Sequence, residues 1–377
     1  MDASNIQSHG FIGHNLKLAR VLNGLTLAEL AEEIQTSRQY VHQLETGARH
    51  PSSMQLAEIA KRLCVKESFF HIIPTGVLDD TSIHFRSNRT AKQSSRVKAK
   101  ANIALFIRSI DVLSKYVCFP DINFPCEENF GANPDIEKIA EQTREYWKLG
   151  SGPIDNITRL AEYSGAIVTS FSGVSEDVDA LSSVIKRPVI VRNDAKDSPG
   201  RLRFDIAHEI GHIVMHQDMV TGCKQTEAQA NRFASAFLMP RNSFVREFRF
   251  GNSRMNWKAL SALKARWGVS KAALLYRARQ LDLLSDTKYR SHIIALKKYE
   301  AKKEKDDHLL ITEKSELIRH ALESYVTAYG KTVDDFLDEL HVSESLLSNI
   351  FDFDLHELRE MEKPAGNVIS ISKFTSA

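Results

Sequence analysis

The chain has 377 residues, of which 42% are hydrophobic and 26% charged, and its formal net charge is +2. This composition is typical of a globular protein with two or three domains, and it excludes disordered and fibrous classes. The N-terminal residues lack the basic and apolar regions of a secretory signal, and no apolar run approaches about 18 residues. The four cysteines form no CxxC pair. We therefore expect a cytoplasmic protein with no membrane partner and no disulfide framework.

The first 80 residues carry apolar side chains at helical spacing in three successive stretches, which predicts a small all-α domain over 1–80. Between the second and third stretches, Ser37 is a candidate N-cap and Gly47 a helix stop, so a short further helix is expected there. Thr26 and Glu29 form a capping-box pair that marks the start of the preceding helix. Two helices joined by so short a turn cross as in a helix-turn-helix.

The segment TLAELAEEIQTSRQYVHQLETGARHPSSMQLAEIAKRL resembles an XRE-type helix-turn-helix domain of the lambda-repressor-like fold, and the likeness runs from about residue 15 to residue 70. The resemblance implies that the second helix of the motif enters the major groove of a double-stranded DNA operator, which a homodimer binds. The side chains that it places at bases or phosphates are Ser37, Arg38, Gln39, Tyr40 and Gln43. Arginine can pair with guanine and glutamine with adenine through two hydrogen bonds, so these side chains suit base reading.

The charge and the turn of this domain leave an alternative open. The turn position that is usually glycine in the family is Gln35 here, and a left-handed backbone there would cost roughly 1–2 kcal/mol. Residues 1–78 carry seven basic and seven acidic side chains, whereas affinity for nucleic acid depends largely on neutralised phosphates. The domain could therefore dock a protein partner in place of DNA. A basic run over 83–116 could supply the missing charge, although such runs are also typical of solvated helix faces.

The middle of the chain is expected to pass from a linker into a second domain. Apolar residues at helical spacing follow a polar loop, so 81–130 is predicted to be a basic linker and helix. A stretch with proline and asparagine ends this helix, and a new helix opens at Asp135. Runs rich in β-branched residues at 166–170, 180–184 and 189–192 predict short strands. The domain over 131–286 is therefore expected to be α+β.

The stretch RFDIAHEIGHIVMH carries the residues of a metal site. In a helix, His208 and His212 lie one turn apart on one face and can bind the same ion, while Glu209 lies beside them, where it can take a proton from metal-bound water. The opposite side is apolar and is expected to face the core. Eight residues of helix separate the backbones of His208 and His216 by about 12 Å, so His216 is expected to support a ligand or cap the helix.

Two residues compete for the role of third ligand. Asp218 follows His212 by six residues, where the HExxHxxGxxD pattern places a ligand, but Met215 occupies the position of the glycine that the turn requires. Glu227 opens a helix, EAQANRFASAFLMP, whose other face is apolar. A carboxylate beside core residues needs a partner, and a metal ion provides one. We therefore predict a Zn²⁺ site made of His208, His212 and Glu227, with Asp218 as the weaker candidate.

The segments VIVRN, RLRFDIAHEIGHIVMHQD and TEAQANRFASAFLMP occur in this order and resemble the ImmA/IrrE family of zinc-dependent peptidases, over about 85–284. The resemblance implies a zincin-like domain with a gluzincin-like site, in which the three ligands just named bind zinc and Glu209 is the catalytic base. Asn231 takes the place of an aspartate that often orients a ligand histidine, and its neutral amide polarises that histidine less. Several members of the family cleave repressors with XRE domains, so an XRE-type repressor is the implied substrate.

The C-terminal part is predicted to be a helical region over 287–377 that packs against the rest or regulates it, and its charged run AKKEKDD is expected to be a solvated linker. The whole chain is thus expected to be mainly α with a small β-sheet. Its leading function is that of a DNA-binding regulator with zinc-dependent endopeptidase activity. The alternative is a transcriptional regulator or toxin–antitoxin component whose peptidase fold acts as a sensor or docking module with little catalysis. Glu209 favours the enzyme, since a binding module does not need it.

Overall fold

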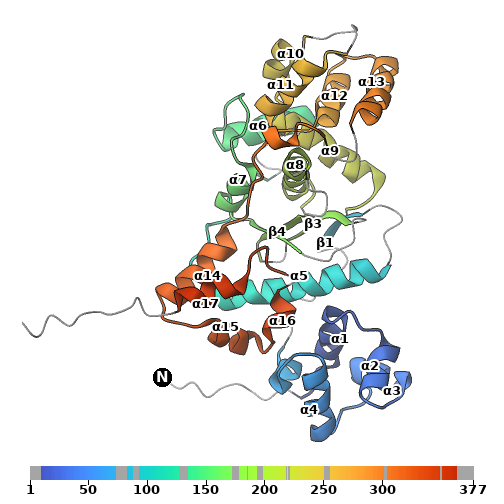
Figure 1. Cartoon of the computed structure of the whole chain (residues 1–377), viewed down its shortest axis with the longest axis vertical. Coiled ribbons are helices and arrows are strands. Elements are labelled where there is room, and N and C mark those ends of the chain that lie inside the picture. The colour runs from blue at the N-terminus through green and yellow to red at the C-terminus, as the bar shows by residue number, and fades with distance from the viewer. Residues whose placement is uncertain are drawn as a thin grey trace, which may run out of the picture. The chain divides into compact units, whose positions relative to one another are not determined.

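The structure is a computed structural model, and Figure 1 shows its helices and strands. The residues that it describes are 10–73, 83–87, 93–126, 135–171, 178–184, 186–192, 198–217, 219, 221–249, 255–300, 304–348 and 350–362. The chain divides into two compact units, the first drawn from 1–75, 97–118 and 318–377 and the second from 76–96 and 119–317. Helices make up most of both units, and one small sheet lies in the second. The expected mainly α class is confirmed.

The first unit begins with the expected small all-α domain. Its helices are α1 (Gly13–Leu22), α2 (Leu27–Glu33), α3 (Arg38–Glu45), α4 (Ser53–Arg62) and the 3₁₀ turn η1 (Glu67–His71). Both bonds of the capping box between Thr26 and Glu29 are present, and the Ser37 hydroxyl accepts the Tyr40 N–H at 3.1 Å. These caps satisfy N–H groups that have no partner within the helix, so α2 and α3 begin where predicted. Gln35 has a φ of 52°, so a non-glycine residue makes the left-handed turn.

The C-terminal helices of the first unit pack beside this domain. The unit also contains most of α5 (Gln93–Leu113) and α14 (Leu317–Thr327), with α15 (Val333–Leu340), α16 (Glu344–Leu347) and α17 (Leu355–Met361). A short antiparallel bridge pairs Val65 with Val342, and the Lys66 ammonium lies 2.5 Å from the Asp338 carboxylate. The C-terminal region and the N-terminal domain are therefore joined through the segment that follows α4.

The sheet of the second unit has four strands in the order β1-β3-β4-β2. The strands are β1 (Ile83–Ser87), β2 (Ile167–Ser170), β3 (Val178–Val184) and β4 (Pro188–Arg192). The pairs β1/β3 and β3/β4 are antiparallel, whereas β2 and β4 are parallel. Three of these strands are where the sequence predicts them. The basic linker expected at the start of 81–130 includes a strand that the sequence did not predict, because residues 83–87 pair with β3.

Helices pack around this sheet and share a hydrophobic core. They are α6 (Ile136–Tyr146), α7 (Ile157–Tyr163), α8 (Pro199–Met215), α9 (Lys224–Leu238), α10 (Arg241–Glu247), α11 (Trp257–Trp267), α12 (Lys271–Gln280) and α13 (Asp286–Tyr299). Helix α8 contacts β3 and β4 as well as α7 and α9 (Figure 1). A Cβ atom on Gly211 would lie 2.9 Å from the ring of Phe233, so α8 and α9 can approach this closely only because Gly211 has no side chain.

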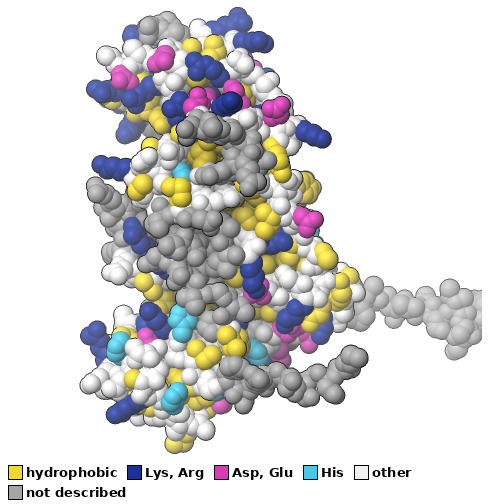
Figure 2. Space-filling view, turned by 180° about the vertical axis from the view of Figure 1, so that it is seen from behind, with side chains coloured by type: hydrophobic (Ala, Val, Ile, Leu, Met, Phe, Trp, Pro, Cys, Tyr) yellow, Lys and Arg dark blue, Asp and Glu magenta, His cyan; other side chains and the backbone are white. Residues whose placement is uncertain are grey.

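The face of the second unit that Figure 2 shows is mixed in charge. Figure 2 shows basic and acidic side chains interspersed at its α10–α13 end, at the top of the view. In the part of the chain that the structure describes, no helix is both long enough and apolar enough to span a membrane.

The run at 301–307, expected to be a solvated linker, is instead held in the core over its described part. The ammonium of Lys264, which is fully buried, lies 2.7 Å from Glu304, 2.8 Å from Asp306 and 2.6 Å from Asp307. The ammonium of Lys271 lies 2.8 Å from the second oxygen of Asp306. The prediction is wrong for the described part of the run, because its three carboxylates are paired with lysines from α11 and α12.

Candidate metal centre

Helix α8 places two imidazoles side by side. Pro199 occupies its first turn, where a missing N–H costs nothing, and the helix then runs without interruption to Met215. The spacing of four residues brings the rings of His208 and His212 together edge to face, with centroids 4.7 Å apart. The two Nε2 atoms are 3.0 Å apart, and neither side chain is more than 1% exposed. Two imidazole nitrogens therefore point to one buried place.

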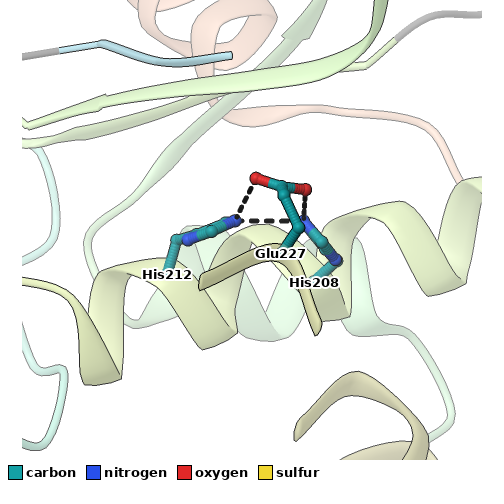
Figure 3. Close-up of side chains that lie close together, drawn as sticks. All are labelled: His208, His212 and Glu227. Atoms are coloured by element: carbon teal, nitrogen blue, oxygen red, sulfur yellow. Dashed lines mark hydrogen bonds and ion pairs between the residues drawn. The ribbon is translucent and has the colours of Figure 1, made fainter. Parts of the chain in front are cut away.

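Helix α9 adds the carboxylate of Glu227 to this pair. Its two oxygens lie 3.3 Å from His208 Nε2 and 3.4 Å from His212 Nε2. Figure 3 shows the carboxylate over both nitrogens. Burial raises the pKa of the Glu227 carboxyl, but hydrogen bonds with the two histidines outweigh burial and hold the pKa well below its ordinary value. The helix begins at Lys224, one turn earlier than expected, so Glu227 lies in its first turn.

The donor set fits a zinc ion. The three ligand atoms all lie within 4.8 Å of one another, and the neighbouring pairs are 3.0 to 3.4 Å apart. Zinc bonds of about 2.0–2.1 Å at tetrahedral angles separate ligand atoms by about 3.3 Å, so the observed spacing matches. Calcium and magnesium prefer six or more oxygen ligands, whereas two imidazoles and one carboxylate are typical of zinc enzymes with an open fourth position.

Two further side chains contact the imidazoles of His208 and His212 from outside, and a third contacts one of those two. Asn231 Oδ1 lies 3.1 Å from His208 Nδ1, and His216 Nδ1 lies 2.9 Å from His212 Nδ1. The other nitrogen of His216, Nε2, is 3.0 Å from Gln229 Oε1. Burial lowers the pKa of the His216 imidazole below its ordinary value. Sequence reasoning named Asn231 and His216 but missed Gln229, because no motif or spacing marks it.

His216 also ends the helix, as one of its two expected roles requires. It is the C-cap of α8, and its N–H donates to the carbonyl of His212 at 2.9 Å. Glu209, the expected base, is fully buried on the same helix. Asp218, the weaker ligand candidate, lies outside the described residues.

The residues expected at DNA occupy the start of α3. Arg38 and Gln39 are exposed in its first turn, and Gln43 follows Gln39 by one turn and is half-buried. The hydroxyl of Ser37 is used as the N-cap of the helix. Tyr40 is half-buried, and its hydroxyl lies 3.0 Å from Gln55 Oε1 on α4. The structure therefore exposes Arg38 and Gln39 together, leaves Gln43 partly exposed one turn on, and uses Ser37 and Tyr40 within the domain.

Comparison with known proteins assigns both parts. Residues 16–70 match the family model of a helix-turn-helix domain, and residues 161–279 match that of the IrrE N-terminal-like domain. The chain is a fusion of these two domains. The second match includes α8 and α9, so all three metal-ligand candidates lie within a peptidase-family domain. The first match indicates a DNA-binding regulator.

The wider comparisons add little to this assignment. No curated protein matches the chain. Among solved structures, ComR from Streptococcus suis is 14% identical, and the match covers 93% of this chain and 91% of that one. Its TM-score of 0.15 is too low to support an argument about fold or function.

Proposed function

We propose that this fusion is a cytoplasmic, homodimeric DNA-binding regulator with zinc-dependent endopeptidase activity, and that it cleaves a regulatory protein such as an XRE-type repressor. Its parts are those expected from the sequence, with boundaries near residues 80, 130 and 286. The observation that carries the proposal is the convergence of His208, His212 and Glu227 on one buried place beside Glu209. A buried helix that merely carried histidines would not need three ligand atoms within 4.8 Å.

In this function the three side chains hold a zinc ion. When bound, zinc lowers the pKa of a water molecule and polarises a peptide carbonyl. The carboxylate of Glu209 accepts a proton from the attacking water and passes it to the leaving nitrogen. Its burial among apolar neighbours of α8 keeps other water away from this proton. Asn231 and His216 hold the two imidazoles in orientation through their Nδ1 atoms.

Glu209→Gln tests the proposal, because the amide is nearly isosteric and cannot accept the proton. Cells with the wild-type chain should contain new protein N-termini that mass spectrometry detects, and the variant should produce them at least about 10²-fold more slowly. Zinc content and operator binding of the purified variant should be unchanged. Glu145→Gln, an exposed change on α6, is the matched control and should cleave as the wild type does.

The same experiment separates the enzyme from the sensor alternative. If the peptidase fold only senses or docks, Glu209→Gln leaves both the N-termini and the regulation of a reporter gene unchanged, while His208→Ala alters regulation. That pair of results would mean that zinc has a structural role here and would refute the peptidase.

The exposed start of α3 supports base reading by Arg38, Gln39 and Gln43. In a selection from random duplexes, the full chain should enrich a dyad-symmetric site. Arg38→Ala should cost about 1–3 kcal/mol at one base position of that site. Lys61→Ala, an exposed change on α4, should at most lower general affinity. Equal recovery of all sequences by the wild type would refute the DNA-reading role.

A further inference from the structure

A line of three side chains leads from the surface of α9 to the metal centre. It begins at Gln229, whose Oε1 lies 3.0 Å from His216 Nε2. His216 Nδ1 lies 2.9 Å from His212 Nδ1. The opposite nitrogen of His212, Nε2, lies 3.4 Å from Glu227 Oε1 and belongs to the ligand cluster of Figure 3. Both ring nitrogens of His216 and both of His212 are used in these contacts. The position of the proton on one ring therefore determines its position on the next.

The chemistry of each group sets the order of these protons. The amide oxygen of Gln229 can only accept, so His216 carries its proton on Nε2. A neutral imidazole has one N–H, so Nδ1 of His216 has a lone pair and accepts from His212 Nδ1. His216 is 3% exposed, so Gln229 and His212 are the partners of its two ring nitrogens. The single proton of His212 is then on Nδ1, which leaves the Nε2 lone pair directed at the metal centre.

We propose that Gln229, acting through His216, fixes the tautomer of His212 that can bind a metal ion. The opposite proton order would place an N–H on His212 Nε2, and a protonated nitrogen cannot be a ligand. Gln229 and His216 are thus positioning residues for His212, as Asn231 is for His208 by direct contact. The inference deepens the proposed function and rests on its metal site.

Zinc affinity of the full chain, measured by competition with a chelator, tests this relay. Gln229→Met keeps the length of the side chain and removes the acceptor, so zinc should bind about tenfold or more weakly. Gln225→Met, an exposed change on the same helix, is the matched control and should bind zinc as the wild type does. Unchanged affinity in a folded Gln229→Met protein would overturn the relay.

Two changes at His216 separate positioning from packing. His216→Asn places a carbonyl oxygen where Nδ1 was, so it can still accept from His212 and should retain zinc affinity within about threefold. His216→Leu keeps bulk without an acceptor and should lose about tenfold or more. Equal affinities in these two variants, both folded, would mean that His216 acts only by packing.

The protons can also be located directly. In the zinc-bound full chain labelled with ¹⁵N-histidine, two-bond proton–nitrogen spectra should show His216 protonated on Nε2 and His212 on Nδ1. Gln229→Met should broaden or shift the His216 pattern. A His216 ring protonated on Nδ1 would overturn the relay. Because no substrate is used, absence of cleavage in the tests above would refute the peptidase and leave this result standing.

Discussion

The second unit contains two buried polar clusters, and they differ in whether the cluster includes a positively charged side chain. In the metal centre, two imidazole nitrogens and a carboxylate of Glu227 converge, and all three are electron-pair donors. In the cluster around Lys264, by contrast, an ammonium that is fully buried is surrounded by carboxylates at 2.6 to 2.8 Å. The first arrangement could hold a cation from outside, whereas the second already contains its own. Buried charge therefore indicates a site only where the opposite charge is missing.

The cluster around Lys264 is a structural device. Lys271 joins it through Glu300 and Asp306, at 2.6 and 2.8 Å, and Glu304 also accepts the backbone N–H of Lys271. These contacts fasten the segment after α13 to the N-terminal part of α12. Each of these carboxylates is paired with a lysine ammonium, so the cluster already contains its own cations.

Removal of a zinc ligand should have the largest effect of the changes that test the difference between the two clusters. The wild-type chain should hold about one zinc ion, and His208→Ala or Glu227→Ala should hold almost none, because two ligands do not retain zinc against a chelator. Asp218→Ala should hold as much as the wild type. Metal analysis of the purified proteins measures this. Zinc retained by Glu227→Ala would refute the assignment of that ligand.

Removal of the lysine should have the opposite pattern, with zinc retained and stability lost. Lys264→Met removes the ammonium that Glu304, Asp306 and Asp307 share, and only Asp306 keeps a second one, that of Lys271. Breaking a buried pair costs about 3–5 kcal/mol. Urea unfolding of the second unit should measure this loss. Lys258→Met, an exposed change on the same helix, is the control and should lie within about 0.5 kcal/mol of the wild type. A loss of zinc at unchanged stability would reverse the two roles.

Acid should weaken the lysine cluster. Burial raises the pKa of Asp306, but hydrogen bonds with the two lysines outweigh burial and hold the pKa well below its ordinary value. A carboxyl with a depressed pKa in the folded state stabilises the fold above its unfolded pKa of about 4, and this contribution is lost as the pH falls further. Unfolding of the wild type should therefore become easier below about pH 4. The difference between the wild type and Lys264→Met should shrink over the same range.

Most of the candidate metal centre was predictable, because it depends on the spacing of residues that are close in the sequence. Four residues separate His208 and His212, and helical geometry alone places both imidazoles on one face. Glu227 could be predicted as a carboxylate beside an apolar helix face. The caps at Thr26 and Ser37 were predictable for the same reason, since each depends on residues within one turn.

The lysine cluster could not be predicted because its members meet only in the folded chain. Lys264 and Asp307 are 43 residues apart, and the run AKKEKDD has the composition of a solvated segment. The buried ion pair of Arg203 with Glu313 is another such case, at a separation of 110 residues. Gln229 was missed on the same ground, because its role depends on where α9 lies against α8.

The smallest predicted effect is a change in zinc affinity, which follows from adding one negative charge beside the candidate metal centre. Asn231→Asp replaces the amide oxygen at 3.1 Å from His208 Nδ1 by a carboxylate, which accepts a stronger hydrogen bond and makes that imidazole a better ligand. Zinc should bind more tightly by up to about tenfold, which chelator competition measures.

The matched change removes a charge from the cluster that is already balanced. Asp307→Asn should weaken one contact with Lys264 and destabilise the second unit by about 1–3 kcal/mol. The two substitutions are the same exchange in opposite directions. If Asn231→Asp weakened zinc binding in a folded protein, Asn231 would not accept from His208, and the metal centre would be oriented in some other way than the structure indicates.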